Sequence, residues 1–210
     1  PKDAYDAIEL GVNQYLRDHQ NLYAPTVHDA AVRNIMNRIR SKILDKLPTQ
    51  TRRTEEQIEF QQFSTPPDLA FAMNWAAHLS NKDTVLEPSA GLGGLAVFAH
   101  NAGADVVMNE YNARRADLLK TLDLGTVYHE NAEQLDNILP ESVKPTVVIM
   151  NPPFNSTAGR IEGQRKTTNG LVHLEQALKR LEPGGRLVAL IGKGKVYADP
   201  KVLEDWLSTM

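Results

Sequence analysis

Short apolar runs alternate with longer amphipathic segments from about residue 65 onward. The apolar runs have the length of buried strands, and the segments between them repeat their apolar residues every three or four positions. The expected strands are 84–87, 105–109, 126–129, 146–150 and 186–191. The expected helices are 66–79, 94–102, 112–122, 132–138 and 171–181. This alternation predicts an α/β fold in which a mostly parallel, twisted sheet carries helices on both faces.

The first 60 residues have a helical pattern without strands between the helices. Apolar side chains recur at helical spacing in two stretches: Tyr5, Ile8, Val12, Tyr15 and Leu16, and then Ile35, Met36, Ile39, Ile43, Leu44 and Leu47. Thr26 and Asp29 have the spacing of a capping box at the start of the second helix, which Pro48 ends. We therefore expect a helical N-terminal extension over residues 1–60 and an α/β domain over residues 61–210.

The composition is that of an average globular protein, with 210 residues, 41% of them hydrophobic and 23% charged. No apolar run reaches about 18 residues and no signal-peptide pattern opens the chain, so we expect a cytoplasmic protein without membrane contact. The chain contains no cysteine, which excludes disulfides, cysteine-based zinc sites and thiolate nucleophiles. No metal-ligand spacing accompanies His129, so no metal is expected. The first residue is Pro1 rather than Met, which favours a segment of a larger polypeptide.

Positive charge is concentrated in one stretch, although the net charge is −3. Between Arg33 and Arg53, one acid stands against seven basic residues: Arg33, Arg38, Arg40, Lys42, Lys46, Arg52 and Arg53. Such a run is either a solvated helix face or a surface that contacts phosphates. The polar segment Asn155–Asn169, with Arg160, Arg165 and Lys166, predicts a loop that orders on nucleic acid.

The tetrapeptide Asn151-Pro152-Pro153-Phe154 follows a buried strand and is the most informative motif. The side-chain oxygen of Asn151 and the carbonyl of Pro152 can both accept hydrogen bonds from one exocyclic amino group, because the prolines fix the backbone that carries them. Phe154 offers a face on which a flat ring can stack. This arrangement suits methylation of an amine whose lone pair is delocalised into a ring or a carbonyl.

A strand, a glycine-rich turn and a helix form the second motif, from Glu87 through Ser89, Gly91 and Gly93. The glycines let the backbone approach a ligand, and a carboxylate at the strand end suits a positively charged group such as an amino-acid ammonium. Many strand–helix turns contain glycine, so the acid is the more informative part. The turn lacks the spacing of a dinucleotide fingerprint and the Gly-Lys of a phosphate loop.

The next two strands also end in polar residues. Glu110 lies 19 positions after Gly91, close to the interval of about 20 residues expected for an acid that hydrogen-bonds ribose hydroxyls. Asn131 follows the third strand, where it can contact the edge of an adenine ring. His129 is expected to be a hydrogen-bonded strand-end residue rather than a catalytic base.

Phe63-Ser64-Thr65-Pro66 leads into the first helix of the α/β part. Thr65 as the cap and Pro66 at the first helical position form a start signal, which is a purely structural role. If that helix packs beside the first strand, Phe63 and Thr65 also flank the ligand site.

In this order the motifs resemble those of S-adenosylmethionine-dependent N6-adenine DNA methyltransferases, such as type I restriction–modification subunits and the phage or plasmid antirestriction methylases. The resemblance covers about residues 62–197. It implies a Rossmann-like methyltransferase domain over residues 61–210 that binds S-adenosylmethionine. The implied cofactor residues are Phe63, Thr65, Glu87, Ser89, Gly91, Glu110, Asn131 and Ala132, with Asn151 to Phe154 around the target base.

The resemblance implies methyl transfer to the N6 amino group of adenine in DNA, with DNA as the partner. The absence of cysteine also excludes 5-methylcytosine formation, which needs a thiolate adduct. Two alternatives remain open: methylation of RNA or of a protein glutamine, and a catalytically silent nucleic-acid-binding module of a larger antirestriction or helicase protein. Members of the family continue into two further strands, so we expect either that more of the protein follows Met210 or that the sheet is completed otherwise.

Overall fold

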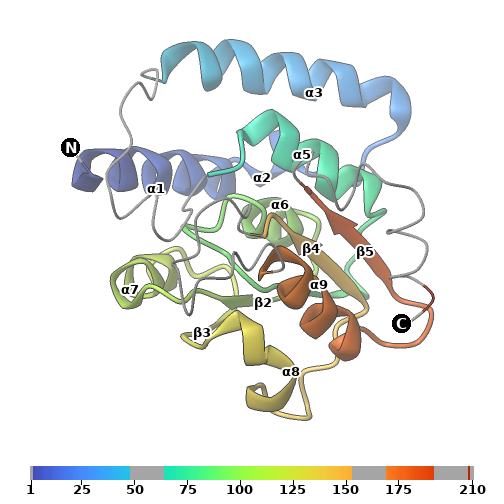
Figure 1. Ribbon diagram of the computed structural model, residues 1–210. Helices are drawn as coiled ribbons and strands as arrows, with labels where there is room; N and C mark the ends of the chain where they lie inside the picture. Colours follow the sequence, from blue (N-terminus) through green and yellow to red (C-terminus); the bar gives the residue numbers. More distant parts are fainter. Residues whose placement is uncertain (1, 48–63, 153–168, 192–207, 209–210) are drawn as a thin grey trace.

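A five-stranded parallel sheet forms the centre of the protein, shown in Figure 1 as a computed structural model that describes residues 2–47, 64–152, 169–191 and 208. The strands are β1 (Thr84–Glu87), β2 (Asp105–Asn109), β3 (Thr126–Tyr128), β4 (Val147–Met150) and β5 (Arg186–Ala189). Their order in the sheet is β3-β2-β1-β4-β5, and every pairing is parallel. All five strands expected from the sequence form, each within a few residues of its expected bounds, and the predicted α/β fold is confirmed.

The direction in which strands are added to the sheet reverses at β1. The chain places β2 and then β3 on one side of β1, and it returns to place β4 and β5 on the other. In register, Leu86 of β1 lies between Val107 of β2 and Val148 of β4. Ligands of such sheets bind outside the carboxyl ends of the strands at this reversal point. The ends of β1 and β4 are therefore the place to search for a site.

Helices cover both faces of the sheet. After the N-terminal part, the chain forms α5 (Pro67–Ala76), α6 (Ala96–Asn101), α7 (Ala113–Lys120), the short 3-10 helix η2 (Ala132–Gln134), α8 (Leu135–Ile138) and α9 (Asn169–Arg180). Alternate residues of the strands belong to two separate hydrophobic cores. Val147 and Ile149 join a core with Phe71 of α5 and Phe98 of α6. Val148 and Met150 join a second core that includes residues of α8 and α9.

The N-terminal helices form an outer layer over one face. They are α1 (Lys2–Asp18), α2 (Gln20–Tyr23), α3 (Asp29–Lys42) and the 3-10 helix η1 (Leu44–Lys46), and α3 runs along the outside of α5 (Figure 1). Leu16, Tyr23 and Ile39 are fully buried in the same core as Phe71 and Phe98. The N-terminal helices therefore share a core with the sheet. The expected boundary near residue 60 lies outside the described residues.

The buried face of α1 differs from its predicted apolar stripe. Ile8 and Tyr15 are 37% and 40% exposed, whereas Asp6 and Asn13 are 4% and 3% exposed. The polar side chains can be buried because each has a partner on the α/β part of the protein: Asp6 pairs with Arg114, and Asn13 donates to the carbonyl of Leu92. The face of α1 toward the sheet is therefore partly polar.

The predicted capping box of the second long helix is wrong. Helix α3 begins at Asp29 after His28, whose backbone is extended, and no side chain caps it. Thr26 lies outside the helix, and the next residue, Val27, packs against the core. Among the described residues, no helix is long and apolar enough to cross a bilayer.

Candidate active site

The carboxyl ends of three strands are tied together by Asn109, the last residue of β2. Its side chain is fully buried, and Nδ2 donates to the carbonyl oxygens of Pro88 and Glu130 at 3.0 Å each. Its Oδ1 accepts from the backbone N–H of Glu130 at 2.9 Å. The residues that follow β1 and β3 are thus held at fixed positions on either side of β2. The sequence analysis assigned Asn109 no role; the signal that pointed to it is an amide at the end of a buried strand.

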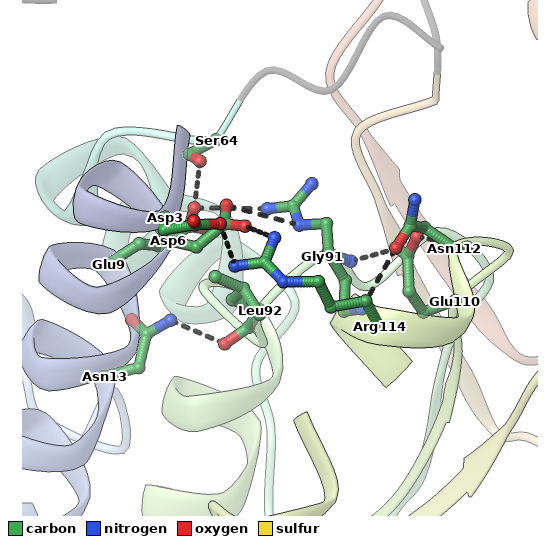
Figure 2. Close-up of polar contacts among 11 residues, drawn as sticks. Asp3, Asp6, Glu9, Asn13, Ser64, Gly91, Leu92, Glu110, Asn112 and Arg114 are labelled. Atoms are coloured by element: carbon green, nitrogen blue, oxygen red, sulfur yellow. Dashed lines mark hydrogen bonds and ion pairs between the residues drawn. The ribbon is translucent and has the colours of Figure 1, made fainter. Parts of the chain in front are cut away.

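Glu110 holds the glycine-rich turn after β1. Its carboxylate accepts from the backbone N–H of Gly91 and from that of Asn112, each at 2.8 Å (Figure 2). Gly91 and Gly93 have φ angles of +58° and +83°, which side chains with a Cβ adopt only with strain. The predicted acid of β2 and the predicted glycine turn of β1 therefore meet directly.

Two of the predicted acids are buried at this edge of the sheet. Glu87 is 3% exposed, and burial raises its pKa well above the usual value, although it accepts a hydrogen bond from the backbone of Ala96. Its Oε2 atom is buried and, among the described residues, has no hydrogen-bond partner. Burial also raises the pKa of Glu110, against the opposing effect of its bonds to Asn112 and Gly91. A buried carboxylate oxygen without a partner is costly, and a bound cation would offset that cost.

A third acid, Glu9, reaches this place from the N-terminal helix α1. Its Oε2 accepts from the hydroxyl of Ser64 at 2.5 Å (Figure 2). The same atom accepts from the guanidinium of Arg115 at 3.1 Å. Arg115 belongs to α7, and its guanidinium would lie 3.3 Å from a Cβ atom added at Gly91. Burial raises the pKa of Glu9, while Arg115 and Ser64 oppose that shift. The sequence analysis missed Glu9 and Arg115 because their partners are far away along the chain.

The end of β4 is joined to the segment before α5. The side chain of Asn151 donates from Nδ2 to the hydroxyl of Thr65 at 3.0 Å, and Pro152 beside it is buried. Thr65 does not cap the helix as predicted: Pro66 is the N-cap and Pro67 is the first helical residue. Pro66 has ψ of 137°, because a residue that precedes a proline avoids the helical region. The threonine hydroxyl is thereby left to contact Asn151.

The remaining described residues of the predicted site lie around these contacts. Ser89 Oγ is 3.5 Å from Nδ1 of His173 on α9, and burial lowers the pKa of that imidazole. Asn131 uses its side-chain oxygen to accept from the N–H of Glu133 at 3.0 Å, which caps η2, and Ala132 is buried. Its contact to an adenine ring stays a prediction. His129 contacts the Tyr111 carbonyl oxygen at 2.7 Å, so it is a hydrogen-bonded strand-end residue as expected.

Some of the predicted site cannot be placed. Phe63, Pro153 and Phe154 lie outside the described residues, as do positions 155–168 of the predicted loop. Asn169 is the first residue of α9. Among Thr65, Glu87, Gly91, Glu110 and Asn151, the structure shows direct contacts between Thr65 and Asn151 and between Gly91 and Glu110.

The basic stretch is exposed along α3 and η1. Arg33, Arg38, Arg40, Lys42 and Lys46 are all exposed, whereas Arg52 and Arg53 lie outside the described residues. Arg38 donates to the carbonyl of Leu22 at 3.2 Å, and Arg40 pairs with Asp68 at 3.0 Å. A partly exposed ion pair such as that of Arg40 contributes little to stability, and both arginine side chains remain exposed to a polyanion.

Comparison with solved structures identifies the fold. A candidate RNA methyltransferase from Pyrococcus horikoshii superposes with a TM-score of 0.56 and 18% identity over 81% of this chain and 80% of that one. TrmN from Thermus thermophilus superposes with a TM-score of 0.51 and 23% identity, over 75% of this chain but 46% of that one. No protein-family model and no curated protein matches the chain. The protein therefore has the Rossmann-like fold found among methyltransferases.

Proposed function

We propose that this protein transfers a methyl group from S-adenosylmethionine to the N6 amino group of adenine in DNA. The observation that carries the proposal is the contact between Asn151 and Thr65. It joins residues of two of the motifs that carry the resemblance, the Asn-Pro-Pro-Phe segment after β4 and the Phe-x-Thr-Pro segment before α5. Thr65 and Asn151 meet where β4 ends, and Glu87 and Glu110 stand at the carboxyl ends of the neighbouring strands, Glu87 as the last residue of β1 and Glu110 directly after β2.

The described residues fit the cofactor. When bound, S-adenosylmethionine supplies an electrophilic methyl group on a positively charged sulfur. The buried, unpartnered Oε2 of Glu87 is suited to a cationic ligand, and its place at the end of β1 favours the amino-acid part. Glu110 is placed for the ribose hydroxyls, and the turn at Gly91 and Gly93 leaves room for close approach. Ser89, Asn131 and Ala132 complete the proposed contacts, with Phe63 and Thr65 on the side of α5.

The proposed target site is built around the end of β4. The hydrogen bond to Thr65 turns the nitrogen of the Asn151 amide toward α5, so the side-chain oxygen is the atom that accepts from the amino group of the base. The carbonyl of Pro152 accepts the second amino hydrogen. Both bonds draw electron density onto the amino nitrogen and fix its orientation, which supplies much of the rate acceleration. Phe154 stacks on the base that has been rotated out of the duplex.

Two features support DNA as the partner, and one supports RNA. The exposed cations of α3 and η1 and the segment 155–169 supply positive charge for a phosphate backbone. The Phe-x-Thr-Pro segment and the Phe of Asn-Pro-Pro-Phe favour DNA over a protein glutamine. RNA is the second candidate, because the Pyrococcus horikoshii structure is described as a candidate RNA methyltransferase.

The test is transfer of radiolabelled methyl groups from S-adenosylmethionine to unmethylated DNA, to RNA and to a glutamine-containing protein, followed by nucleoside and amino-acid analysis. We expect N6-methyldeoxyadenosine. Label in RNA or protein would replace the proposed acceptor, and absence of label in all three would contradict the proposed reaction. The variant Asn151→Ala should abolish transfer while the cofactor affinity stays within about tenfold, or about 1.4 kcal/mol. Equal loss of both would contradict the role of Asn151.

A further inference from the structure

We infer that helix α1 is part of the cofactor site, and that Glu9 on it is a specificity-determining residue that favours the cationic cofactor over its uncharged thioether product. The inference rests on the proposed function, since it takes S-adenosylmethionine as the ligand. Glu9 lies outside the sequence motifs of the proposed site, on a helix of the predicted N-terminal extension. Figure 2 shows Glu9 pointing from α1 toward Ser64.

Helix α1 makes a direct hydrogen bond to the glycine-rich turn. Asn13 donates to the carbonyl of Leu92, between the two glycines of the turn, at 2.7 Å. At the two ends of the helix, Asp6 accepts from Arg114 at 2.6 Å, and Arg17 donates to the carbonyl of Leu122 at 2.6 Å. Asn13 and Asp6 are almost fully buried. The position of Glu9 is therefore set by its helix and by its own two hydrogen bonds.

The described residues of the site include more carboxyl groups than cationic groups. Glu9, Glu87 and Glu110 repel one another electrostatically, and each is disfavoured as an anion by burial. Arg115 lies against Glu9, and its guanidinium is also 3.9 Å from the carboxylate of Asp6. The buried Oε2 of Glu87 has no partner among the described residues, which is an independent observation in favour of binding a cationic group at this place. In the described part of the chain, no group of three or more histidine, cysteine or acidic side chains is arranged to hold a metal ion.

S-adenosylmethionine and the product that it leaves, S-adenosylhomocysteine, differ in net charge. S-adenosylmethionine carries an ammonium, a sulfonium and a carboxylate, which leaves one net positive charge. S-adenosylhomocysteine has lost the sulfonium charge and is neutral overall. A site with excess carboxylate binds the first ligand more tightly than the second, because Coulomb attraction acts on the net charge in a poorly solvated place. Replacing Glu9 by glutamine removes one negative charge and leaves Asp6, at 3.9 Å, as the anionic partner of Arg115, so the positive charge of Arg115 is less fully offset. Both changes weaken binding of the cation.

The experiment is calorimetric titration of S-adenosylmethionine and of S-adenosylhomocysteine into the wild-type protein and Glu9→Gln. We expect the affinity for S-adenosylmethionine to fall about tenfold and that for S-adenosylhomocysteine by less than about threefold. Asp3→Asn is the matched control, because Asp3 is an exposed acid on the same helix with one ion pair to Arg114. It should leave the ratio of the two affinities unchanged. Glu9→Asp keeps the charge and should restore most of the ratio.

The possible outcomes separate this inference from the proposed function. If the wild type binds both ligands and Glu9→Gln changes both affinities equally or not at all, the inference is wrong and the proposed function stands. If the wild type binds neither ligand, both are wrong. If binding follows the expected pattern but no nucleic acid is methylated, only the proposed acceptor fails. If Glu9→Gln lacks a cooperative melting transition, Ser64→Ala replaces it as the test variant, because it removes the hydrogen bond that orients Glu9. Ser64→Ala should shift the ratio of the two ligand affinities in the same direction by about threefold.

Discussion

The side chain of Asn151 donates a hydrogen bond to the hydroxyl of Thr65 over 3.0 Å, and this bond joins residues 86 positions apart. Asn151 directly follows strand β4, whereas Thr65 comes from the segment that enters α5. The bond determines which end of the asparagine amide faces a ligand. Thr65 acts in this account by orienting Asn151, which separates its role from that of a helix cap.

Thr65→Val should slow methyl transfer about tenfold, the effect of losing one orienting hydrogen bond of about 1.4 kcal/mol. Valine has nearly the same shape as threonine and lacks only the hydroxyl. Thr65→Ser, which keeps the hydroxyl, should retain most of the rate. Steady-state kinetics at saturating cofactor measure the effect, and equal rates in Thr65→Val and the wild type would show that the bond does not matter for turnover.

Glu110→Ala should lower the affinity for S-adenosylhomocysteine at least tenfold, because it removes the acceptor for the ribose hydroxyls. The substitution also releases the N–H groups of Gly91 and Asn112, so the loss alone does not identify the ribose. A 2′-deoxy analogue of the ligand resolves this. The wild type should bind the analogue more weakly than the ribose form, and the variant should bind both alike. A preserved difference in the variant would assign the ribose contact to another residue.

Gly93→Ala should destabilise the ligand-free protein by about 1–3 kcal/mol. The φ angle of +83° is strained for alanine, and the added Cβ would lie 2.8 Å from Cδ1 of Leu119. Gly94→Ala is the matched control, since its Cβ would have as its nearest neighbour the Thr65 carbonyl at 3.9 Å. The control should change the free energy of unfolding by less than about 0.5 kcal/mol in urea denaturation. Similar effects of the two substitutions would contradict this view of the turn.

Glu87→Gln should stabilise the ligand-free protein at pH 7, and the gain should shrink as the pH falls toward 4.5. Burial raises the folded-state pKa of Glu87 well above its ordinary value of 4.5, so the folded protein retains a proton that the unfolded chain releases. The wild type therefore loses stability as the pH rises from about 4.5 toward that raised pKa, and glutamine removes this dependence. Urea denaturation of both proteins across pH 4.5 to 8 measures the difference, which should grow with pH; a constant difference would mean that the pKa is ordinary.

The pKa of Asp83 is shifted in the opposite direction to that of Glu87, so Asp83 should not disturb the measurement on Glu87. Burial alone would raise the pKa of Asp83, but hydrogen bonds from Ser80, Thr146 and Arg186 together lower it below 3.8. Its contribution to stability is present above pH 3.8 and is lost as the pH falls through the lowered pKa. The two carboxylates thus act in separate pH ranges.

The strands and the motif order could be predicted because they depend on local patterns. Strands β1 and β2 have short apolar runs at their centres; Glu87 is the last residue of β1, and Glu110 directly follows β2. The starts of helices were predicted less well, because the capping preference of a side chain competes with backbone restrictions and with packing against the core. Thr65 and Thr26 are both good caps in isolation, but Pro67 keeps its predecessor out of the helix, and Val27 packs against the core.

The contribution of α1 to the site could not be predicted from local pattern. Its apolar residues suggested a simple amphipathic helix, whereas the buried face carries Asp6 and Asn13. A polar stripe at helical spacing, formed by Asp6, Glu9, Asn13 and Arg17, was visible in the sequence. Without knowledge of Arg114, Arg115 and the turn at Leu92, such a stripe is indistinguishable from a solvent-exposed face.

The ion pair between Glu9 and Arg115 also bears on how the protein acquires its shape during synthesis, since it joins residues 106 positions apart. At a translation rate of about 5–20 residues per second, α1 exists for about 5 to 20 s before α7 has been made. During that interval Asp6 and Glu9 lack their arginine partners, and the chain must later close a long loop to dock the helix. Nascent chains that end before α7 therefore lack a complete cofactor site. Binding of the cofactor would distinguish chains in which α1 has docked against α7 from chains in which it has not.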